Sequence, residues 1–145
     1  ASHTRYCEFM QKKLTISAAC LINNQGEILL VRKRGTSKFM QPGGKPEKGE
    51  SPLQTVIREI KEELGVDFAP DALEYRGEWH GPAANEASTS IHAHLFSGHL
   101  SGKLEPLAEL EELLWIDPKK ALLRGDLAPL LREHVLPSAI ARAGA

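Results

Sequence analysis

The order of apolar and polar residues predicts several strands and one well-marked helix. A β-branched, apolar run at residues 14–22 is typical of a buried strand. Turn-forming residues 23–26 follow, and the strand pattern resumes at residues 27–34, so we expect a hairpin. Three further strands are expected at residues 72–81, 88–100 and 112–117. Residues 35–49 are rich in Gly, Pro and Lys without an apolar period, and a loop of about 15 residues indicates a functional segment.

The helix follows this loop. Ser51 is a good N-cap, Pro52 suits the first helical position, and Gln54 completes a capping-box pattern. Gly65 is the expected stop. At about 100° per residue, five apolar side chains form one core-facing stripe: Leu53, Val56, Ile57, Ile60 and Leu64.

Together these elements predict an α/β fold of the α+β type, in which helices cover a mixed central β-sheet. Residues 118–123 and 126–136 favour one or two closing helices. A chain of 145 residues fits one domain, which we assign to residues 13–145. Residues 1–12 show no periodicity and are interpreted as an N-terminal arm or a remnant of expression.

Composition narrows the class of function. The formal net charge of −1 excludes a globally basic protein that coats nucleic acid. No apolar run approaches the roughly 18 residues that span a bilayer, and no secretory leader is visible. Cys20 lies in an apolar run and is expected to be a buried thiol, and it shares no metal-type spacing with Cys7. We therefore expect a reducing, cytoplasmic setting.

The helix gathers three like charges beside its apolar stripe. Glu59, Glu62 and Glu63 stand at i, i+3 and i+4, a spacing at which like charges destabilise a helix by a few tenths of a kcal/mol per pair. A bound cation would offset this cost, and Mg2+ or Mn2+ suits carboxylate ligands better than zinc does. The competing interpretation is a solvated acidic face with no function.

The segment before the helix favours the metal interpretation. Glycines in residues 41–50 allow close backbone approach to a ligand. Between residues 32 and 48, one acid, Glu47, stands against six basic residues: Arg32, Lys33, Arg34, Lys38, Lys45 and Lys48. A basic segment beside clustered carboxylates fits a phosphate-bearing substrate bridged to the protein by a divalent metal.

These residues resemble the signature of the Nudix hydrolases. That signature is G, five residues, E, seven residues, then R-E-(apolar)-x-E-E-x-G-(apolar). Nine specified positions are filled here: Gly44, Glu50, Arg58, Glu59, Ile60, Glu62, Glu63, Gly65 and Val66. We refer to residues 44–66 as the Nudix box.

The resemblance implies an αβα sandwich and hydrolysis, dependent on Mg2+ or Mn2+, of a pyrophosphate bond in a nucleoside diphosphate linked to another group. It assigns the metal ligands and the general base to three carboxylates, Glu59, Glu62 and Glu63, with either Glu59 or Glu62 as the base. The carbonyl of Gly44 is a further expected ligand. Arg58 belongs to the catalytic machinery by the same resemblance, and Arg58 and Glu50 are expected to orient the carboxylates.

Further site residues are expected outside the box. The resemblance places another acidic ligand before a late strand, where we favour Glu109 as ligand and Glu112 as support over plain surface glutamates. Pro82 lies sixteen positions after Val66, a spacing associated with ADP-ribose hydrolases. The candidate substrate contacts are Arg32, Arg34, Gln41, Lys45, Pro82, Asn85 and Glu86.

His92 and His94 share one face of a predicted strand, a spacing that can bind zinc. The sequence shows no third nitrogen or sulfur ligand nearby, so an ordinary polar face is favoured.

Several functions remain open at this level. The leading one is a pyrophosphohydrolase of a nucleoside triphosphate or related nucleotide. The alternatives are an ADP-ribose or nucleotide-sugar pyrophosphatase and a catalytically silent nucleotide sensor. The expected partner is a small nucleotide, with neither a membrane nor a nucleic acid, and a homodimer is open beside a monomer.

Overall fold

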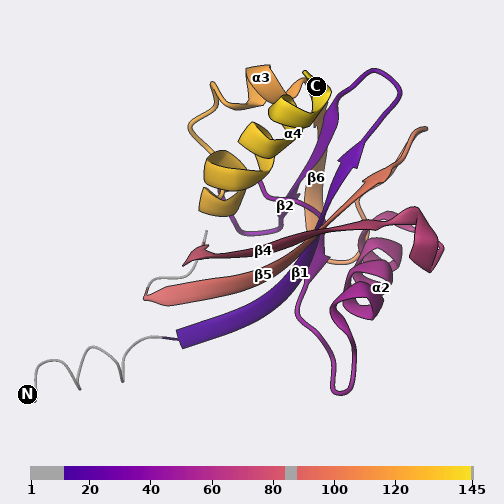
Figure 1. Ribbon diagram of the computed structural model, residues 1–145, viewed down its shortest axis with the longest axis vertical. Coiled ribbons are helices and arrows are strands. Elements are labelled where there is room, and N and C mark those ends of the chain that lie inside the picture. Colours follow the sequence, from indigo (N-terminus) through magenta and orange to yellow (C-terminus); the bar gives the residue numbers. More distant parts are fainter. Residues whose placement is uncertain (1–11, 84–87, 145) are drawn as a thin grey trace, which may run out of the picture.

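The computed structural model describes residues 12–83 and 88–144. Within them, six strands form one sheet whose main path runs β4-β5-β1-β2-β6, and the short β3 pairs with β1 beside this path (Figure 1). The strands are β1 (Lys12–Ile22), β2 (Ile28–Lys33), β3 (Gly43–Gly44), β4 (Glu74–Pro82), β5 (Thr89–His99) and β6 (Leu110–Ile116). A short 3-10 helix, η1 (Pro70–Ala72), precedes β4.

The sheet is mixed, as predicted. β1 and β5 run parallel, with Lys12 opposite Thr89 at one end and Ile22 opposite His99 at the other. The other strand pairs are antiparallel. β1 and β2 form the expected hairpin, in which Ile22 faces Ile28 before β2 continues along β6.

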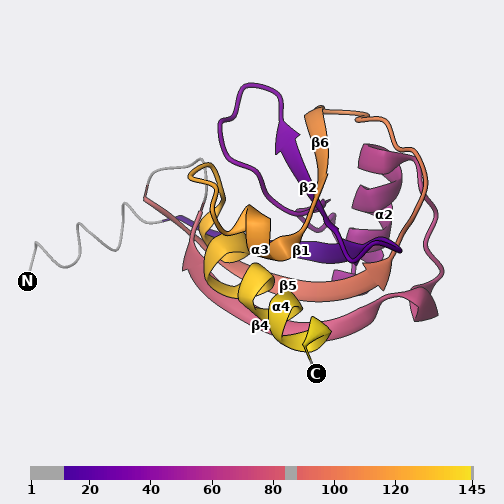
Figure 2. The same ribbon diagram turned by 90° about the horizontal axis from the view of Figure 1, so that it is seen from above.

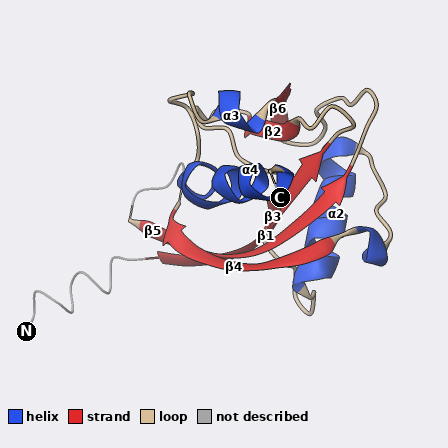
Figure 3. Cartoon of the chain, turned by 45° about the horizontal axis from the view of Figure 1, so that its top comes forward, coloured by secondary structure: helices blue, strands red, loops and turns tan. Residues whose placement is uncertain are grey.

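Helices cover both faces of the sheet, which confirms the predicted αβα sandwich. α2 (Pro52–Leu64) lies on one side, while α3 (Pro118–Ala121) and α4 (Leu136–Ala143) lie on the other (Figures 2 and 3). Successive residues of β1 alternate between the two cores, because neighbouring side chains of a strand point to opposite faces. Ala19 and Leu21 pack towards α2, whereas Ala18 and Cys20 pack towards α4. The Cys20 thiol is free and buried, as expected.

The ends of α2 match the sequence prediction. The Ser51 hydroxyl accepts a hydrogen bond from the Gln54 amide at 3.1 Å, and the Ser51 amide donates to the Gln54 side chain at 2.9 Å. Gly65 ends the helix with a left-handed φ of 73°. The box helix is therefore fixed at both ends.

The predicted loop at residues 35–49 is partly built into the sheet. Met40 and Val31 exchange two backbone hydrogen bonds of 2.8 Å. Gly43 and Gly44 form β3 beside Ser17 and Ala18 of β1. This pairing needs glycine, because a Cβ atom at Gly43 would overlap the backbone of β1. The sequence has no side-chain pattern here that would reveal the pairing.

The closing helix lies further along the chain than predicted. A π-helical turn, η2 (Leu131–Val135), leads into α4, whereas the sequence suggested a helix over residues 126–136. Pro137 lies within α4, although proline usually ends an α-helix because it lacks the N–H that the helix requires. The wider π turn before it allows the helix to continue. None of the helices in the described part of the chain is long and apolar enough to cross a membrane.

Candidate active site

Glu63 is the most buried of the three clustered carboxylates. Its side chain comes from α2 and the residue is 2% exposed. One oxygen, Oε1, accepts a hydrogen bond from the Gly43 amide at 3.1 Å. The other, Oε2, is buried and has no hydrogen-bond partner among the described residues. Burial raises the pKa of Glu63 to about 8, because the charged form loses its hydration.

Glu59 and Glu62 continue this acidic face towards solvent. The Glu59 side chain is 12% exposed, and burial raises the pKa of its carboxyl group. The Glu62 side chain is half exposed. Arg58 Nη1 donates to Glu59 at 3.1 Å and to Glu62 at 3.3 Å. The three carboxylates therefore form one row from the core to the surface.

Arg58 and Glu50 tie the loop of the box to its helix. Arg58 Nε and Nη2 donate to the Glu50 carboxylate at 2.6 and 2.9 Å, and Nη2 also donates to the Lys45 carbonyl at 2.9 Å. The Glu47 amide donates to Glu50 at 2.8 Å. The hydrogen bonds from Arg58 hold the pKa of Glu50 down at about 2. This bidentate pair fits the orienting role that the resemblance implies.

A cavity of about 530 Å³ opens beside the acidic face. Its wall has a polar part and an apolar part. The polar part includes Gly44 and the charged residues Lys33, Lys45, Glu47, Arg58, Glu59 and Glu109, and Gln41 is a neutral polar residue that also lines the cavity. The apolar part comprises Leu14, Ile16, Met40, Ile91, Ala128 and Leu130. The cavity is therefore suited to a ligand with one charged end and one apolar end.

Gln41 places an unpaired amide in this wall. The residue is 5% exposed, and its Nε2 atom is buried without a hydrogen-bond partner among the described residues. An unsatisfied buried amide is costly, so such a group in a cavity wall points to a ligand.

The residues expected outside the box fall into two groups. Glu109 lines the cavity, and its carboxylate lies 3.5 Å from Lys33 Nζ. Glu112, by contrast, accepts a hydrogen bond from Arg32 Nε at 3.0 Å. Arg34 donates to a backbone carbonyl at 2.6 Å. Neither of these two arginines lines the cavity.

Lys33 also lines the cavity, although the sequence placed it among the basic residues of this segment and not among the expected substrate contacts. The register of β2 against β6 shifts between Arg32 and Lys33, and such an irregularity cannot be read from the alternation of residues. Pro82 lines the cavity, as does Ala83. The expected contacts Asn85 and Glu86 lie outside the described residues.

The donor set fits a hard divalent cation. Glu59, Glu62, Glu63 and the Gly44 carbonyl offer oxygen atoms, which Mg2+ and Mn2+ prefer. The orphaned, buried Oε2 of Glu63 gives this fit a structural reason, because a bound cation would satisfy it. Gly44 lies so close that a Cβ atom there would overlap the Glu59 carboxylate. The loop of the box thus approaches the helix closely at Glu59.

A model of the NUDIX domain matches residues 12–136 of this chain. The chain therefore belongs to the Nudix hydrolase family, and the resemblance of the box is confirmed.

Relatives and solved structures agree with this assignment. The chain is 32% identical over 117 residues to the CTP pyrophosphohydrolase of Escherichia coli K12, covering 76% of this chain and 81% of the relative. It is 41% identical over 59 residues to the 8-oxo-dGTP diphosphatase of the same organism, covering 38% of this chain and 46% of the relative, about half its length. The crystal structure of the MutT protein from Methanosarcina mazei Go1 has a similar fold, with a TM-score of 0.77 at 22% identity over 93% of this chain and 98% of that one.

Proposed function

We propose that this chain is a pyrophosphohydrolase of nucleoside triphosphates that depends on Mg2+ or Mn2+. One observation carries the proposal: a cavity lined by both apolar and charged side chains has Glu59 of the Nudix box in its wall. A nucleotide has matching chemistry, with an apolar base at one end and a chain of charged phosphates at the other. The 32% identity to a relative named CTP pyrophosphohydrolase supports the same class of substrate.

The phosphate end of the substrate lies at the polar wall. Lys33 and Lys45 line this wall and supply positive charge to the phosphates. A divalent cation bound among the glutamates neutralises further phosphate charge when the P–O bond breaks. Arg58 does not neutralise phosphate directly, since its guanidinium is engaged by Glu50, Glu59 and Glu62. Its role is to hold the carboxylates in place.

Glu59 is the better candidate for the general base. A base must reach the water molecule that attacks the phosphate, within roughly 3 Å. Glu59 lines the cavity, whereas Glu62 does not. Burial also raises the pKa of Glu59, which makes its carboxylate a stronger base than an exposed one.

The base end of the substrate meets Gln41. The amide of this residue offers an acceptor oxygen and a donor nitrogen, Nε2, and Nε2 is buried without a partner among the described residues. Cytosine and guanine present both a carbonyl oxygen and an amino group, whereas adenine lacks the carbonyl. We therefore expect cytosine and guanine nucleotides to be better substrates than adenine nucleotides.

ADP-ribose or a nucleotide sugar is the second candidate substrate. Pro82, whose spacing from the box is associated with ADP-ribose hydrolases, does line the cavity. An adenine base has no carbonyl oxygen that could accept a hydrogen bond from Gln41 Nε2. For this reason we place this candidate second.

A substrate panel tests the proposal. Purified protein is assayed with Mg2+ and with Mn2+ against CTP, GTP, ATP, their deoxy forms, 8-oxo-dGTP, ADP-ribose and nucleotide sugars. We expect a nucleoside monophosphate and pyrophosphate from CTP or GTP, at a kcat/KM at least tenfold above that for ATP. Glu59→Gln, Glu62→Gln and Glu63→Gln should each reduce turnover by orders of magnitude without unfolding the chain.

Two neighbouring glutamates give a matched control. Glu109 lines the cavity, while Glu111 lies two positions away, 3.9 Å from Arg34, and does not line it. Glu109→Gln should lower kcat/KM at least tenfold, and Glu111→Gln should leave it within a factor of about two. Faster cleavage of ADP-ribose than of any triphosphate would support the second candidate. A chain that binds nucleotides but cleaves none of them would be a sensor, and the enzymatic proposal would fail.

A further inference from the structure

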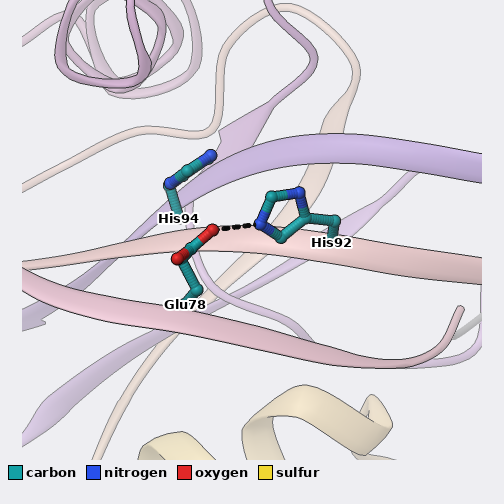
Figure 4. Close-up of side chains that lie close together, drawn as sticks. All are labelled: Glu78, His92 and His94. Carbon is teal, nitrogen blue, oxygen red and sulfur yellow. Dashed lines mark hydrogen bonds and ion pairs between the residues drawn. The ribbon is translucent and has the colours of Figure 1, made fainter.

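Three side chains of types that can bind a metal ion lie close together on the sheet, and none of them lines the cavity. Glu78 comes from β4, and His92 and His94 come from β5 (Figure 4). Ile91 of β5 lines the cavity, so the alternation of the strand places His92 and His94 on the opposite face of the sheet. Glu78 pairs with His94 in the β4–β5 register and shares this face. The cluster is therefore not part of the cavity wall; Phe96, which shares its face of β5, packs in the core under α2, so the cluster lies on the α2 face of the sheet.

The geometry of the cluster suits a metal ion. One ligand atom from each side chain lies within 4.8 Å of the other two. A tetrahedral Zn2+ with bonds of about 2.0–2.1 Å holds its ligand atoms roughly 3.4 Å apart, so small side-chain rotations suffice. His92 Nε2 already contacts the Glu78 carboxylate. Glu78 and His92 are 50% and 33% exposed, which leaves a path for an ion to enter.

Neighbouring side chains orient both imidazoles. The Tyr75 hydroxyl lies 3.1 Å from His94 Nδ1. If Nδ1 carries the proton and donates to this hydroxyl, Nε2 of His94 presents its lone pair as a ligand, the arrangement typical of metal-binding histidines. The His80 ring stacks on the His92 ring with centroids 4.3 Å apart and planes 6° apart. Both ligand rings thus have a neighbour that restricts their rotation.

We propose that Glu78, His92 and His94 form a binding site for Zn2+ or a similar first-row divalent metal ion. Two imidazoles and one carboxylate are a zinc-type ligand set, unlike the all-oxygen set of the Nudix box. Three protein ligands leave one coordination position, which faces solvent and takes water or a ligand from another molecule. The site cannot be predicted from the sequence alone, because its third ligand, Glu78, lies on another strand. Only the register of β4 and β5 brings it beside the histidines.

The site would join an edge strand to its neighbour. β4 is at the end of the strand order and pairs with β5. A metal ion held by Glu78 on β4 and by two residues on β5 links these strands through side chains as well as through backbone hydrogen bonds. We therefore expect bound Zn2+ to raise the melting temperature of the folded chain.

Calorimetry with Zn2+ tests the site. The chain is prepared without a polyhistidine tag, stripped of metal with EDTA, and titrated with Zn2+ in an excess of Mg2+, which occupies the carboxylates of the Nudix box. We expect one equivalent of Zn2+ to bind. Glu78→Gln, His92→Gln and His94→Gln should each weaken this binding at least tenfold. His99→Gln is the matched control, because His99 lies on the same strand but is hydrogen-bonded to Asn24 at 2.6 Å outside the cluster.

Two further measurements keep the test decisive. Proton NMR of the unmodified chain should show the imidazole signals of His92 and His94 shifting with Zn2+, while the His99 signal stays in place. Co2+ in place of Zn2+ should give the visible absorption of a tetrahedral site, and the His92→Gln chain should lack it. The proposal fails if no Zn2+ binds in Mg2+, or if the three cluster variants bind Zn2+ as tightly as His99→Gln does.

Discussion

Glu63 has a buried carboxylate, and one of its oxygens has no hydrogen-bond partner among the described residues. Its neighbours are the Gly43 amide, which donates to Oε1, and Glu59 and Glu109, whose charges raise its pKa further. A side chain in these surroundings opposes the folded state until a cation joins it. At this position, the residue that we expect to bind metal is also the residue that weakens the metal-free fold.

The first prediction concerns these opposite effects of Glu63 on metal binding and on the stability of the metal-free fold. Saturating Mg2+ should stabilise the wild-type chain, by about 2.7 kcal/mol at a concentration 100 times the dissociation constant. Glu63→Gln should remove most of this gain, because an amide is a poor ligand for Mg2+. In EDTA at pH 8, however, Glu63→Gln should be at least as stable as the wild type, because it buries no ionisable group. Urea unfolding with Mg2+ and with EDTA measures both effects.

A result against this view would be a Glu63→Gln chain that gains as much from Mg2+ as the wild type. Glu111→Gln provides the control for the loss of one negative charge near the site, and it should keep the full gain.

Glu50 supplies the second prediction, which concerns acid. Its pKa is about 2 in the folded chain, against an ordinary value of 4.5, because Arg58 donates two hydrogen bonds to it. A lowered folded-state pKa means that the stabilisation is fully present above 4.5 and is lost as the pH falls towards 2. Glu50→Gln should thus be less stable than the wild type at pH 7, and the difference should shrink steadily between pH 4.5 and pH 2.

Urea midpoints measured at intervals from pH 7 to pH 2.5 check this expectation. Glu105→Gln serves as the control for the loss of one glutamate, since no ion pair of Glu105 is found among the described residues. A difference between Glu50→Gln and the wild type that is constant across the whole range would contradict the assignment.

At the scale of elements, the two glycines of β3 have different neighbours: one lies against the backbone of β1 and the other against a carboxylate of the Nudix box. A Cβ atom at Gly43 would collide with the backbone of β1, which cannot move without disturbing the central sheet. A Cβ atom at Gly44 would instead meet the Glu59 side chain, which can rotate away. Neighbouring substitutions should therefore have different consequences.

The third prediction follows from that difference. Gly43→Ala should lower the free energy of unfolding by about 2 kcal/mol or more, as expected for overpacking against backbone. Gly44→Ala should cost less stability but should lower kcat/KM at least tenfold, because it displaces Glu59. Gly125→Ala, where no atom lies within 4 Å of the added Cβ, is the control for both. Equal losses of stability at Gly43 and Gly44 would show that the Glu59 side chain cannot move away, and would contradict this prediction.

The elements differ in how far the sequence could predict them. α2 was predicted at both ends, because Ser51, Gln54 and Gly65 act locally and their hydrogen bonds do not depend on the rest of the fold. The closing helix was misplaced, because Pro137 normally ends a helix and the π turn that accommodates it has no sequence signature. β3 was missed, because two glycines carry no side-chain pattern.

At the scale of the whole molecule, the box was predictable and its surroundings were not. Glu59, Glu62 and Glu63 share one helix, so their spacing alone placed them together. The cavity wall joins residues from both ends of the described chain, such as Leu14 and Leu130, and only tertiary packing brings them together. Sequence spacing predicts chemistry within one element, while contacts between elements require the register and packing of the sheet.

The parallel pairing of β1 and β5 has a consequence for how the chain folds. Every partner in this ladder lies 77 positions further along the chain, from Lys12 with Thr89 to Ile22 with His99. Contacts of such long range close a large loop before they contribute any stability, and they slow folding. During synthesis, the edge of β1 that pairs with β5 therefore stays unpaired until the residues of β5, which ends at His99, have left the ribosome. Neither β2, which lies on the other side of β1 in the sheet, nor α2, which packs on its face, covers this edge in the meantime.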